Sequence, residues 1–216
     1  MIKYEKEMNA IIEALDDSGL LSCCIIVGSW AMNFYKEIFE GFTPPIVTTD
    51  LDIFLPNAKT IKGSNIGKLL LDLDYLRDDD YVTGKTRFYS ENGFEIEFLT
   101  LPNRSMSNVI KIKSINVGAE ALGKLRPISW NYITVLNNGH KVNIPSPVSY
   151  CLQKLLINKD RDIAKRDKDM DAIIYIMSYI KTSPKYVDEF NQLLDKMPKK
   201  WKRDIRKTMS ENDLVI

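Results

Sequence analysis

Cysteine and histidine, the residues that most often bind zinc, are scarce in this chain. Its 216 residues include three cysteines and one histidine, His140. Cys23 and Cys24 are adjacent and Cys151 lies far from both, so their spacing fits neither a zinc site nor a disulfide framework. We assign His140 and the cysteines no chemical role, and a reducing cytoplasm is the expected location.

Long apolar runs are also lacking. The longest, Leu20 to Val27, is interrupted by Ser22 and is far shorter than the ~20 residues that cross a bilayer. The first residues include Lys3 and Glu5, and no apolar stretch typical of a secretory signal follows them. We therefore expect no membrane contact.

A large net charge of either sign is missing, because 30 Lys and Arg residues balance 29 Asp and Glu residues to leave +1. The charges are unevenly spread. Residues 151–216 carry an excess of four positive charges, and residues 1–150 an excess of three negative ones. A basic C-terminal part fits an anionic partner such as nucleotide phosphate or RNA.

Hydrophobic residues make up 44% of the chain, which predicts an ordinary globular fold.

Hydrophobic periodicity divides the chain into an α/β part, residues 1–144, and a helical part, residues 145–216. In the first part we predict helices over 3–17, 30–39 and 61–76, strands over 20–27 and 46–55, an exposed turn at 78–80, and hairpins pairing 87–90 with 94–99 and 132–136 with 141–144. Ser146-Pro147 has the favoured order for a helix start, and helix continues to the end with a break near 182–184. The expected fold class is α/β (α+β), with a mixed sheet flanked by helices and a C-terminal helical domain.

Gly28-Ser29 follows the first predicted strand and precedes a helix. A glycine there lets a ligand approach the backbone closely, and the free N–H groups of the helix favour an anion. Ser29 adds a hydroxyl group. The alternative is an ordinary tight turn with a serine cap.

Asp50 and Asp52 lie two residues apart in the second predicted strand, so both side chains project from one face. Leu51, Ile53 and Leu55 would then point into the core. Two carboxylates this close repel each other unless a cation lies between them, and Mg²⁺ commonly takes one or two carboxylates together with substrate phosphates. The alternative is an edge strand with acidic residues facing water.

A third acid is expected from the strand over 94–99. Glu95 and Glu97 share a face there, and a metal site needs carboxylates from more than one strand. Such a residue can also accept the proton of an attacking hydroxyl group. Alternation alone does not say which glutamate points into the site, or whether both are simply solvated.

Four cations recur in the C-terminal part at spacings of 7, 4 and 3 residues: Lys154, Arg161, Lys165 and Lys168. On one continuous helix they would share a face that contacts phosphate oxygens. The alternative is a solvated charged face, in which Asp169 simply pairs with Lys165.

The order of these motifs resembles that of the nucleotidyltransferase superfamily associated with DNA polymerase β. The segments that carry the resemblance are Val27-Gly28-Ser29, Thr48-Thr49-Asp50-Leu51-Asp52-Ile53, Glu95-Ile96-Glu97 and the helix after Ile144-Pro145-Ser146-Pro147. Within the superfamily the chain looks like the bacterial branch that includes abortive-infection toxins, whose usual threonine matches Thr48. The resemblance spans roughly residues 20–175 and implies a nucleotidyltransferase-type fold.

The resemblance also implies a reaction, the transfer of a nucleotidyl group from a nucleoside triphosphate (NTP) to a hydroxyl group. Asp50, Asp52 and Glu97 would hold Mg²⁺ or Mn²⁺, with Glu97 also a candidate to activate the acceptor. Gly28 and Ser29 would hold the β- and γ-phosphates, and the four cations would neutralise phosphate charge. The acceptor stays open between an RNA end, a protein side chain and a small molecule, and a cognate regulator protein is a further expected partner. The alternatives are a nucleotide-binding module without turnover and a partner protein with a vestigial site.

Overall fold

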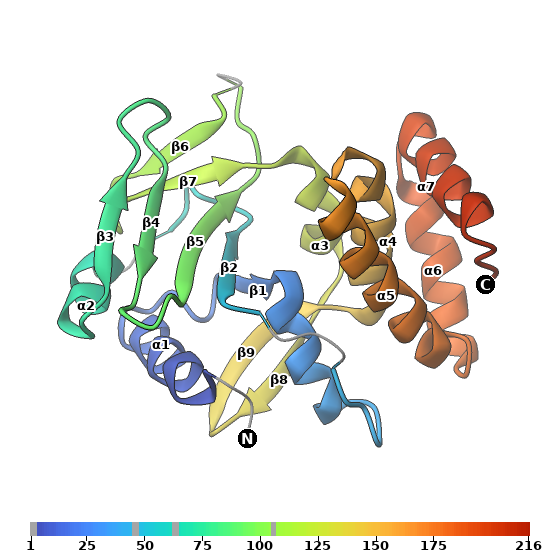
Figure 1. Cartoon of the computed structure of the whole chain (residues 1–216), viewed down its shortest axis with the longest axis horizontal. Helices are drawn as coiled ribbons and strands as arrows, with labels where there is room; N and C mark the ends of the chain where they lie inside the picture. Colours follow the sequence, from blue (N-terminus) through green and yellow to red (C-terminus); the bar gives the residue numbers. More distant parts are fainter. Residues whose placement is uncertain (1–3, 45–47, 62–64, 105–106) are drawn as a thin grey trace.

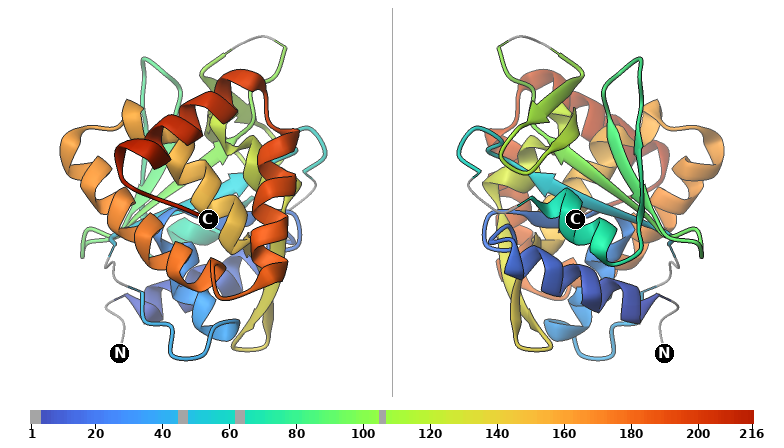
Figure 2. Two further views of the ribbon diagram at one scale, coloured as in Figure 1. Left: turned by 90° about the vertical axis from the view of Figure 1, so that its right-hand side faces the viewer. Right: turned by 90° about the vertical axis from the view of Figure 1, so that its left-hand side faces the viewer.

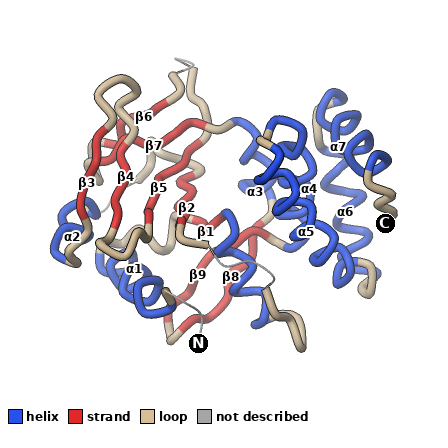
Figure 3. Tube along the Cα trace, viewed as in Figure 1, coloured by secondary structure: helices blue, strands red, loops and turns tan. Residues whose placement is uncertain are grey.

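The computed structural model describes residues 4–44, 48–61, 65–104 and 107–216. Figure 3 shows the strands gathered in one part of the molecule and the C-terminal helices in another. The elements, in chain order, are α1 (Glu5–Asp17), β1 (Ile25–Val27), η1 (Gly28–Glu37), β2 (Asp50–Leu55), α2 (Ile66–Asp72), β3 (Leu76–Asp79), β4 (Thr86–Tyr89), β5 (Glu95–Thr100), β6 (Val109–Ile112), β7 (Val117–Ala121), η2 (Gly123–Leu125), α3 (Arg126–Trp130), β8 (Tyr132–Asn137), β9 (His140–Pro145), α4 (Pro147–Ile157), η3 (Asn158–Asp160), α5 (Ile163–Ile180), α6 (Pro184–Lys196) and α7 (Lys199–Glu211).

The main sheet is mixed, as the sequence predicts. Its strand order is β1-β2-β5-β4-β3, with β7 paired to β5 and β6 paired to β7 (Figure 1). The central pair, β2 and β5, is parallel, and β1 and β4 flank it in antiparallel orientation. β4 pairs with the first half of β5, whereas β7 pairs with its last two residues. The sheet therefore forks beside the middle of β5.

One face of the sheet packs on the N-terminal helices. Leu51, Ile53 and Leu55 are fully buried, as the alternation in β2 predicts. They belong to the same core cluster as Met8 and Ile11 of α1. Figure 2 shows α1 and α2 on one side of the molecule and α5 to α7 on the opposite side. The main core cluster also includes α4 and α5 side chains, so apolar packing is continuous across residue 145. The division into domains at 144 stays a prediction.

Several local predictions differ from the structure. In the predicted strand 20–27 only Ile25–Val27 is strand, because Leu20 and Leu21 both bond back to the Leu15 carbonyl in turns. The predicted helix 61–76 begins at Ile66, where the Asn65 side chain caps it, and it ends at Asp72. Residues 3, 46–47 and 62–64 of the predicted elements lie outside the described residues.

The predicted turn at 78–80 is wrong for its first two residues, which belong to β3. Asp78 forms an ion pair with Arg87 across the β3–β4 ladder. Asp79 forms one with Arg77 and accepts a hydrogen bond from Thr86. Cross-strand partners thus hold in a strand two acids whose own propensity favours a turn.

Both predicted hairpins are present, as β4–β5 and β8–β9. The helix start at Ser146-Pro147 is present too, with the Ser146 hydroxyl group accepting a hydrogen bond from the Ser149 N–H. The β6–β7 hairpin has no counterpart among the predicted elements. Among the described residues, no helix is both long enough and apolar enough to cross a membrane.

Candidate active site

The acidic side chains of β2 and β5 lie side by side. In the parallel ladder Asp50 is opposite Glu95 and Asp52 is opposite Glu97. Because alternate residues share a face, all four carboxylates project from the same side of the sheet. Asp50, Asp52 and Glu97 line a cavity of about 470 Å³, and Glu95 is not among its lining residues. Of the two candidate glutamates, Glu97 is the one that reaches the cavity.

The same face is closed at the other end of these strands. Phe54 and Leu99 continue the alternation beyond the acids and are buried in a second apolar cluster. Leu125 and Ile128, at the end of η2 and on α3, complete that cluster. η2 and α3 therefore cover the carboxyl ends of β2 and β5 on this face and leave their amino ends open, where the acids lie.

Gly28 and Ser29 bring the chain against the acids. Gly28 directly follows β1 and has φ at +66°, a conformation that favours glycine. A Cβ atom at this position would lie 2.3 Å from the Asp52 Oδ2 atom. The glycine is therefore required both by the turn and by the space that Asp52 occupies. Ser29 lies in the first turn of η1, which is a 3₁₀ helix rather than an α-helix, and lines the cavity.

The acids differ in their local partners. Burial raises the pKa of Asp52 to about 6, and the nearby charges of Glu97 and Asp50 add to this shift. Asp50 accepts a hydrogen bond of 2.9 Å from the buried Thr48 hydroxyl group, which orients its carboxylate. This cluster concentrates negative charge in a partly buried place, where an added cation is favourable.

Lys85 occupies one side of the acidic cluster. Its Nζ atom lies 2.8 Å from Glu97 Oε1 and 2.7 Å from Glu120 Oε2. Glu95 instead lies 3.5 Å from the Arg87 guanidinium group. Lys85 sits where the sheet forks, just before β4 and beside β7. Glu97 is therefore held in place by a cation that belongs to the protein.

The four predicted cations reach the cavity from two helices and a connection, so their placement on one continuous helix is wrong. Lys154 lies on α4, Arg161 follows η3 in extended conformation, and Lys165 and Lys168 lie on α5. The helix breaks because the Asp162 side chain caps α5 by accepting a hydrogen bond from the Lys165 N–H. All four side chains nevertheless line the cavity that holds the acids.

Asp169 neutralises two of these cations. Its carboxylate lies 2.6 Å from the Lys154 Nζ atom and 3.0 Å from the Arg161 Nε atom. Lys154 and Asp169 are both buried, and burial lowers the pKa of Lys154. The predicted alternative, a pair between Asp169 and Lys165, is not the one that forms. Within the described part of the chain, Lys165 and Lys168 have no ion-pair partner.

The donor set fits a divalent cation that binds together with a phosphate. Among the described residues, no three His, Cys, Asp or Glu side chains converge to hold a metal ion by themselves. Magnesium in nucleotide sites takes one or two carboxylates and completes its shell with water and phosphate oxygens. Asp50 and Asp52 offer such a pair, and burial, with the charges of Glu97 and Asp50, raises the pKa of Asp52.

Lys85 and Glu120 are cavity residues that the sequence reasoning missed, and so are Tyr150 and Gln153. Lys85 lies two residues before Arg87, so strand alternation placed it on the Glu97 face and was a usable signal. Glu120 had no such signal, because its position depends on the pairing of β7 with β5. Tyr150 and Gln153 lie on the buried α4, whose nearly continuous burial hides which face meets a ligand.

Comparisons with solved structures identify several similar folds. An antigenic nucleotidyltransferase-like protein from Paracoccidioides brasiliensis is 18% identical, with a TM-score of 0.50 over 95% of this chain and 94% of that one. The antibiotic-resistance factor ANT(2″)-Ia is 11% identical, with a TM-score of 0.49 over 85% of this chain and 86% of that one. The lincosamide antibiotic adenylyltransferase LnuA is 13% identical, with a TM-score of 0.45 over 81% and 96%. No curated protein matches the chain significantly.

A family model described as Nucleotidyltransferase matches residues 6–194. This match contains β1 with Gly28-Ser29, both acidic strands, and the helices that carry the four cations. The match covers most of the chain. The mixed sheet flanked by helices is also similar to the fold of the protein from Paracoccidioides brasiliensis. On the strength of the family match, the chain belongs to the nucleotidyltransferase family and is a nucleotidyltransferase.

Proposed function

We propose that this enzyme transfers a nucleoside monophosphate group from an NTP to a hydroxyl group, with Mg²⁺ or Mn²⁺ held by Asp50 and Asp52. One observation carries the proposal. The three predicted carboxylates of β2 and β5 and the four predicted cations of the C-terminal part line the same cavity of about 470 Å³, with Gly28-Ser29 at its edge. A triphosphate with its cation is the ligand that needs both sets of charges at once.

Different residues of the chain contact different parts of the NTP. Gly28 and Ser29 contact the β- and γ-phosphates, since the glycine leaves the backbone open to close approach. Lys165 and Lys168 neutralise phosphate charge, because neither has an ion-pair partner among the described residues. Arg161 is 35% exposed on its side chain, so it offers donors to the ligand while it still contacts Asp169. Lys154 is buried and paired with Asp169, so it supports the helices that carry these cations.

Glu97 is the residue best placed to take the proton of the acceptor. The acceptor oxygen attacks the α-phosphorus, the bond from that phosphorus to the β-phosphate oxygen breaks, and pyrophosphate leaves with the bonding electrons. A divalent cation, when bound, supplies charge stabilisation for the developing phosphate charge. The hydroxyl proton passes to Glu97, and Lys85 holds the glutamate in position.

The acceptor classes expected from the toxin-like resemblance are an RNA end and a protein side chain, and a small molecule is the third. Structural neighbours include an adenylyltransferase crystallised with lincomycin, which is a property of that protein. A cognate regulator protein belongs to the same proposal. Each class supplies a hydroxyl group, which is all that the chemistry requires.

The test is transfer of label from each common NTP, α-³²P-labelled, to total RNA, total protein and a panel of aminoglycosides and lincosamides. Mg²⁺, Mn²⁺ and a chelator are compared in parallel. We expect label in one acceptor class with the wild type and none with Asp50→Ala/Asp52→Ala. Label that persists in that variant or in the chelator would refute the assigned site. NTP binding by calorimetry without pyrophosphate release would support a binding module instead.

A further inference from the structure

A second pocket lies at the opposite ends of the two central parallel strands. Its volume is about 470 Å³, and it shares no lining residue with the active-site cavity. Pro56 and Asn57 follow β2 at its edge, and Leu101 and Pro102 follow β5. The acids lie near the amino ends of these strands, whereas this pocket lies beyond their carboxyl ends, where ligands of open α/β sheets commonly bind.

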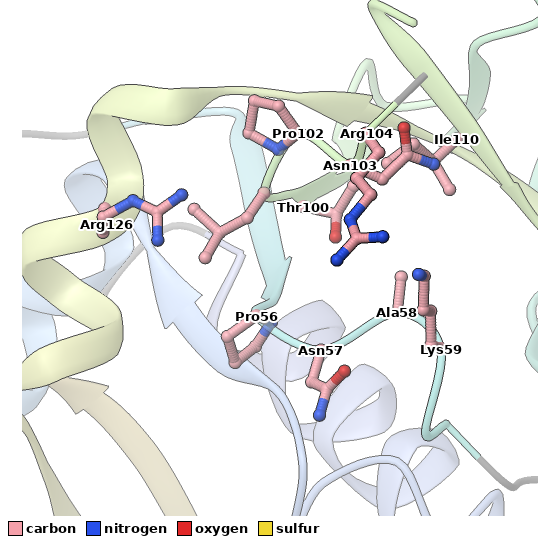
Figure 4. Close-up of a pocket in the computed structure, with 11 residues that line it drawn as sticks. Pro56, Asn57, Ala58, Lys59, Thr100, Pro102, Asn103, Arg104, Ile110 and Arg126 are labelled. Atoms are coloured by element: carbon pink, nitrogen blue, oxygen red, sulfur yellow. The ribbon is translucent and has the colours of Figure 1, made fainter. Parts of the chain in front are cut away.

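Three cations and no acid line this pocket: Lys59, Arg104 and Arg126. All three are exposed and come from different segments, the loop after β2, the loop after β5 and the start of α3. Figure 4 shows Arg126 on one side of the pocket and the head groups of Lys59 and Arg104 on the other. Among the described residues none of the three has an ion-pair partner. Like charges gathered without a partner repel one another until an anion binds.

The surrounding sequence keeps acids away from the pocket. From Ile53 to Leu71 the sequence has no acidic residue, and from Phe98 to Asn131 it has only Glu120. Glu120 is paired with Lys85 in the active-site cavity. An anion in the second pocket would therefore meet three cations and little local repulsion. The remaining lining is largely apolar, from Pro56, Ala58, Leu101, Pro102 and Ile110.

We propose that the pocket formed by Lys59, Arg104 and Arg126 binds a phosphate group at a site separate from the NTP site. Two arginines that project from different elements can each donate two hydrogen bonds to phosphate oxygens, which a lysine alone cannot do. The apolar lining suits the sugar or base attached to that phosphate. The phosphate belongs either to a free anion or to the backbone of a single-stranded RNA, and the two sources share this chemistry.

The site is tested first with inorganic phosphate and the ¹⁵N-labelled full-length protein. We expect the amide signals of Ala58 and Leu101 to shift with a saturable dependence on phosphate. Arg104→Ala/Arg126→Ala should weaken this response by about tenfold or more, because each lost charged hydrogen bond is worth about that factor. Shifts confined to the neighbourhood of Ser29, or an unchanged affinity in the double variant, would overturn the proposal.

A matched control removes the same charge from outside the pocket. Lys111 and Lys113 are exposed residues at the end of β6 that do not line it. Lys111→Ala/Lys113→Ala should change the phosphate affinity by less than about twofold, since neither residue lines the pocket and exposed surface charges are screened. An equal loss in both double variants would show general charge attraction rather than a site. If the double arginine variant does not fold, Arg104→Gln and Arg126→Gln singly provide the same comparison.

A single-stranded RNA oligonucleotide, followed by fluorescence anisotropy, distinguishes the two sources. If the phosphate is part of RNA, Arg104→Ala/Arg126→Ala should weaken RNA binding by about tenfold, with a smaller salt dependence than the wild type. If RNA binding is unchanged while the phosphate response is lost, the ligand is a free anion. Neither measurement requires transfer activity, so failure of this proposal and failure of the transfer proposal can be told apart.

Discussion

The active-site cavity lies between a sheet wall, formed by the strands with the acids, and a helix wall, formed by α4, α5 and their connection. The two walls differ in how their buried charges are paired. On the sheet wall, Asp52 forms no ion pair with any residue that the structure describes, and its pKa is raised to about 6 by burial and acidic neighbours. On the helix wall, the buried Lys154 lies 2.6 Å from Asp169, which also contacts Arg161. The sheet wall therefore holds an acid without a bonded cation, whereas the buried cation of the helix wall has a bonded acid.

This difference distinguishes residues that bind a ligand from residues that stabilise the structure of the site. An unbalanced buried carboxylate lowers stability unless a cation binds. A buried and balanced pair contributes little net stability, but it becomes costly when one partner is removed. We infer that Asp52 is kept for chemistry and that Lys154 mainly supports the wall. On the helix wall, the exposed Lys165 and the half-buried Lys168 resemble Asp52 in lacking an ion-pair partner in the described part of the chain.

The largest expected effect comes from removing the balance on the helix wall. Asp169→Ala would leave Lys154 buried without a partner, at a cost of about 3–5 kcal/mol in the free energy of unfolding. Urea unfolding followed by circular dichroism measures it. Asp171→Ala, an exposed position on the same helix, should stay within about 0.5 kcal/mol of the wild type. Equal stabilities of the two variants would show that Lys154 does not depend on Asp169.

On the sheet wall, the two glutamates of β5 should differ in their effect on catalysis. Glu97→Gln removes the carboxylate that lines the cavity and is expected to lower kcat by about 100-fold. Glu95→Gln, two residues away on the same face, should lower it by less than about fivefold, because Glu95 lies outside the cavity lining. Single-turnover transfer rates decide between them. The reverse order would make Glu95 the third acid.

Removing the unpartnered lysines should weaken binding without affecting the fold. Lys165→Ala/Lys168→Ala is expected to raise the KM for the NTP by about tenfold, from the loss of charged contacts to phosphate. The free energy of unfolding should change by less than about 0.5 kcal/mol. Lys199→Ala/Lys200→Ala removes the same charge from exposed positions on α7 and should leave KM unchanged. A common shift in both variants would point to long-range attraction alone.

The smallest expected effect is a gain in stability. Asp52→Asn removes an unbalanced charge, so the metal-free protein should be more stable by about 1 kcal/mol at pH 7.5, or about 2–4 °C in Tm. The folded-state pKa of about 6 lies above the ordinary aspartate value of 3.8, so protonation favours the folded wild type. The advantage of Asp52→Asn should therefore shrink as the pH falls through 6 towards 4. A less stable variant at neutral pH would mean that the ionised Asp52 does not destabilise the folded protein.

Local patterns in the sequence were sufficient for the sheet wall. Alternation in β2 correctly placed Leu51 and Ile53 in the core, and it put Asp50 and Asp52 together on the other face. Whether Glu95 or Glu97 enters the cavity depends on how far α3 covers the strand ends and on where the sheet forks. Those are tertiary features, and alternation has no access to them.

The helix wall shows the limit of periodicity. Spacing alone predicted one helix from Lys154 to Lys168, but the chain turns sharply after Asn158. Asp162 is a good N-cap residue, so a search for helix starts would have found the break. The cations still meet at one cavity because α4 and α5 pack against each other, a contact that spacing cannot reveal. The pairing of Asp169 with Lys154 follows from that packing.

Gly28 would behave unusually in a saturation mutagenesis experiment with two readouts. A side chain at this position meets Asp52 Oδ2, the mobile end of an acidic side chain, rather than rigid backbone. The backbone penalty for alanine at φ +66° is about 1–2 kcal/mol, which a globular protein often survives. Many substitutions would therefore pass a screen for cellular abundance and fail a screen for nucleotidyl transfer. Position 28 would mark the active site by the gap between the two scores.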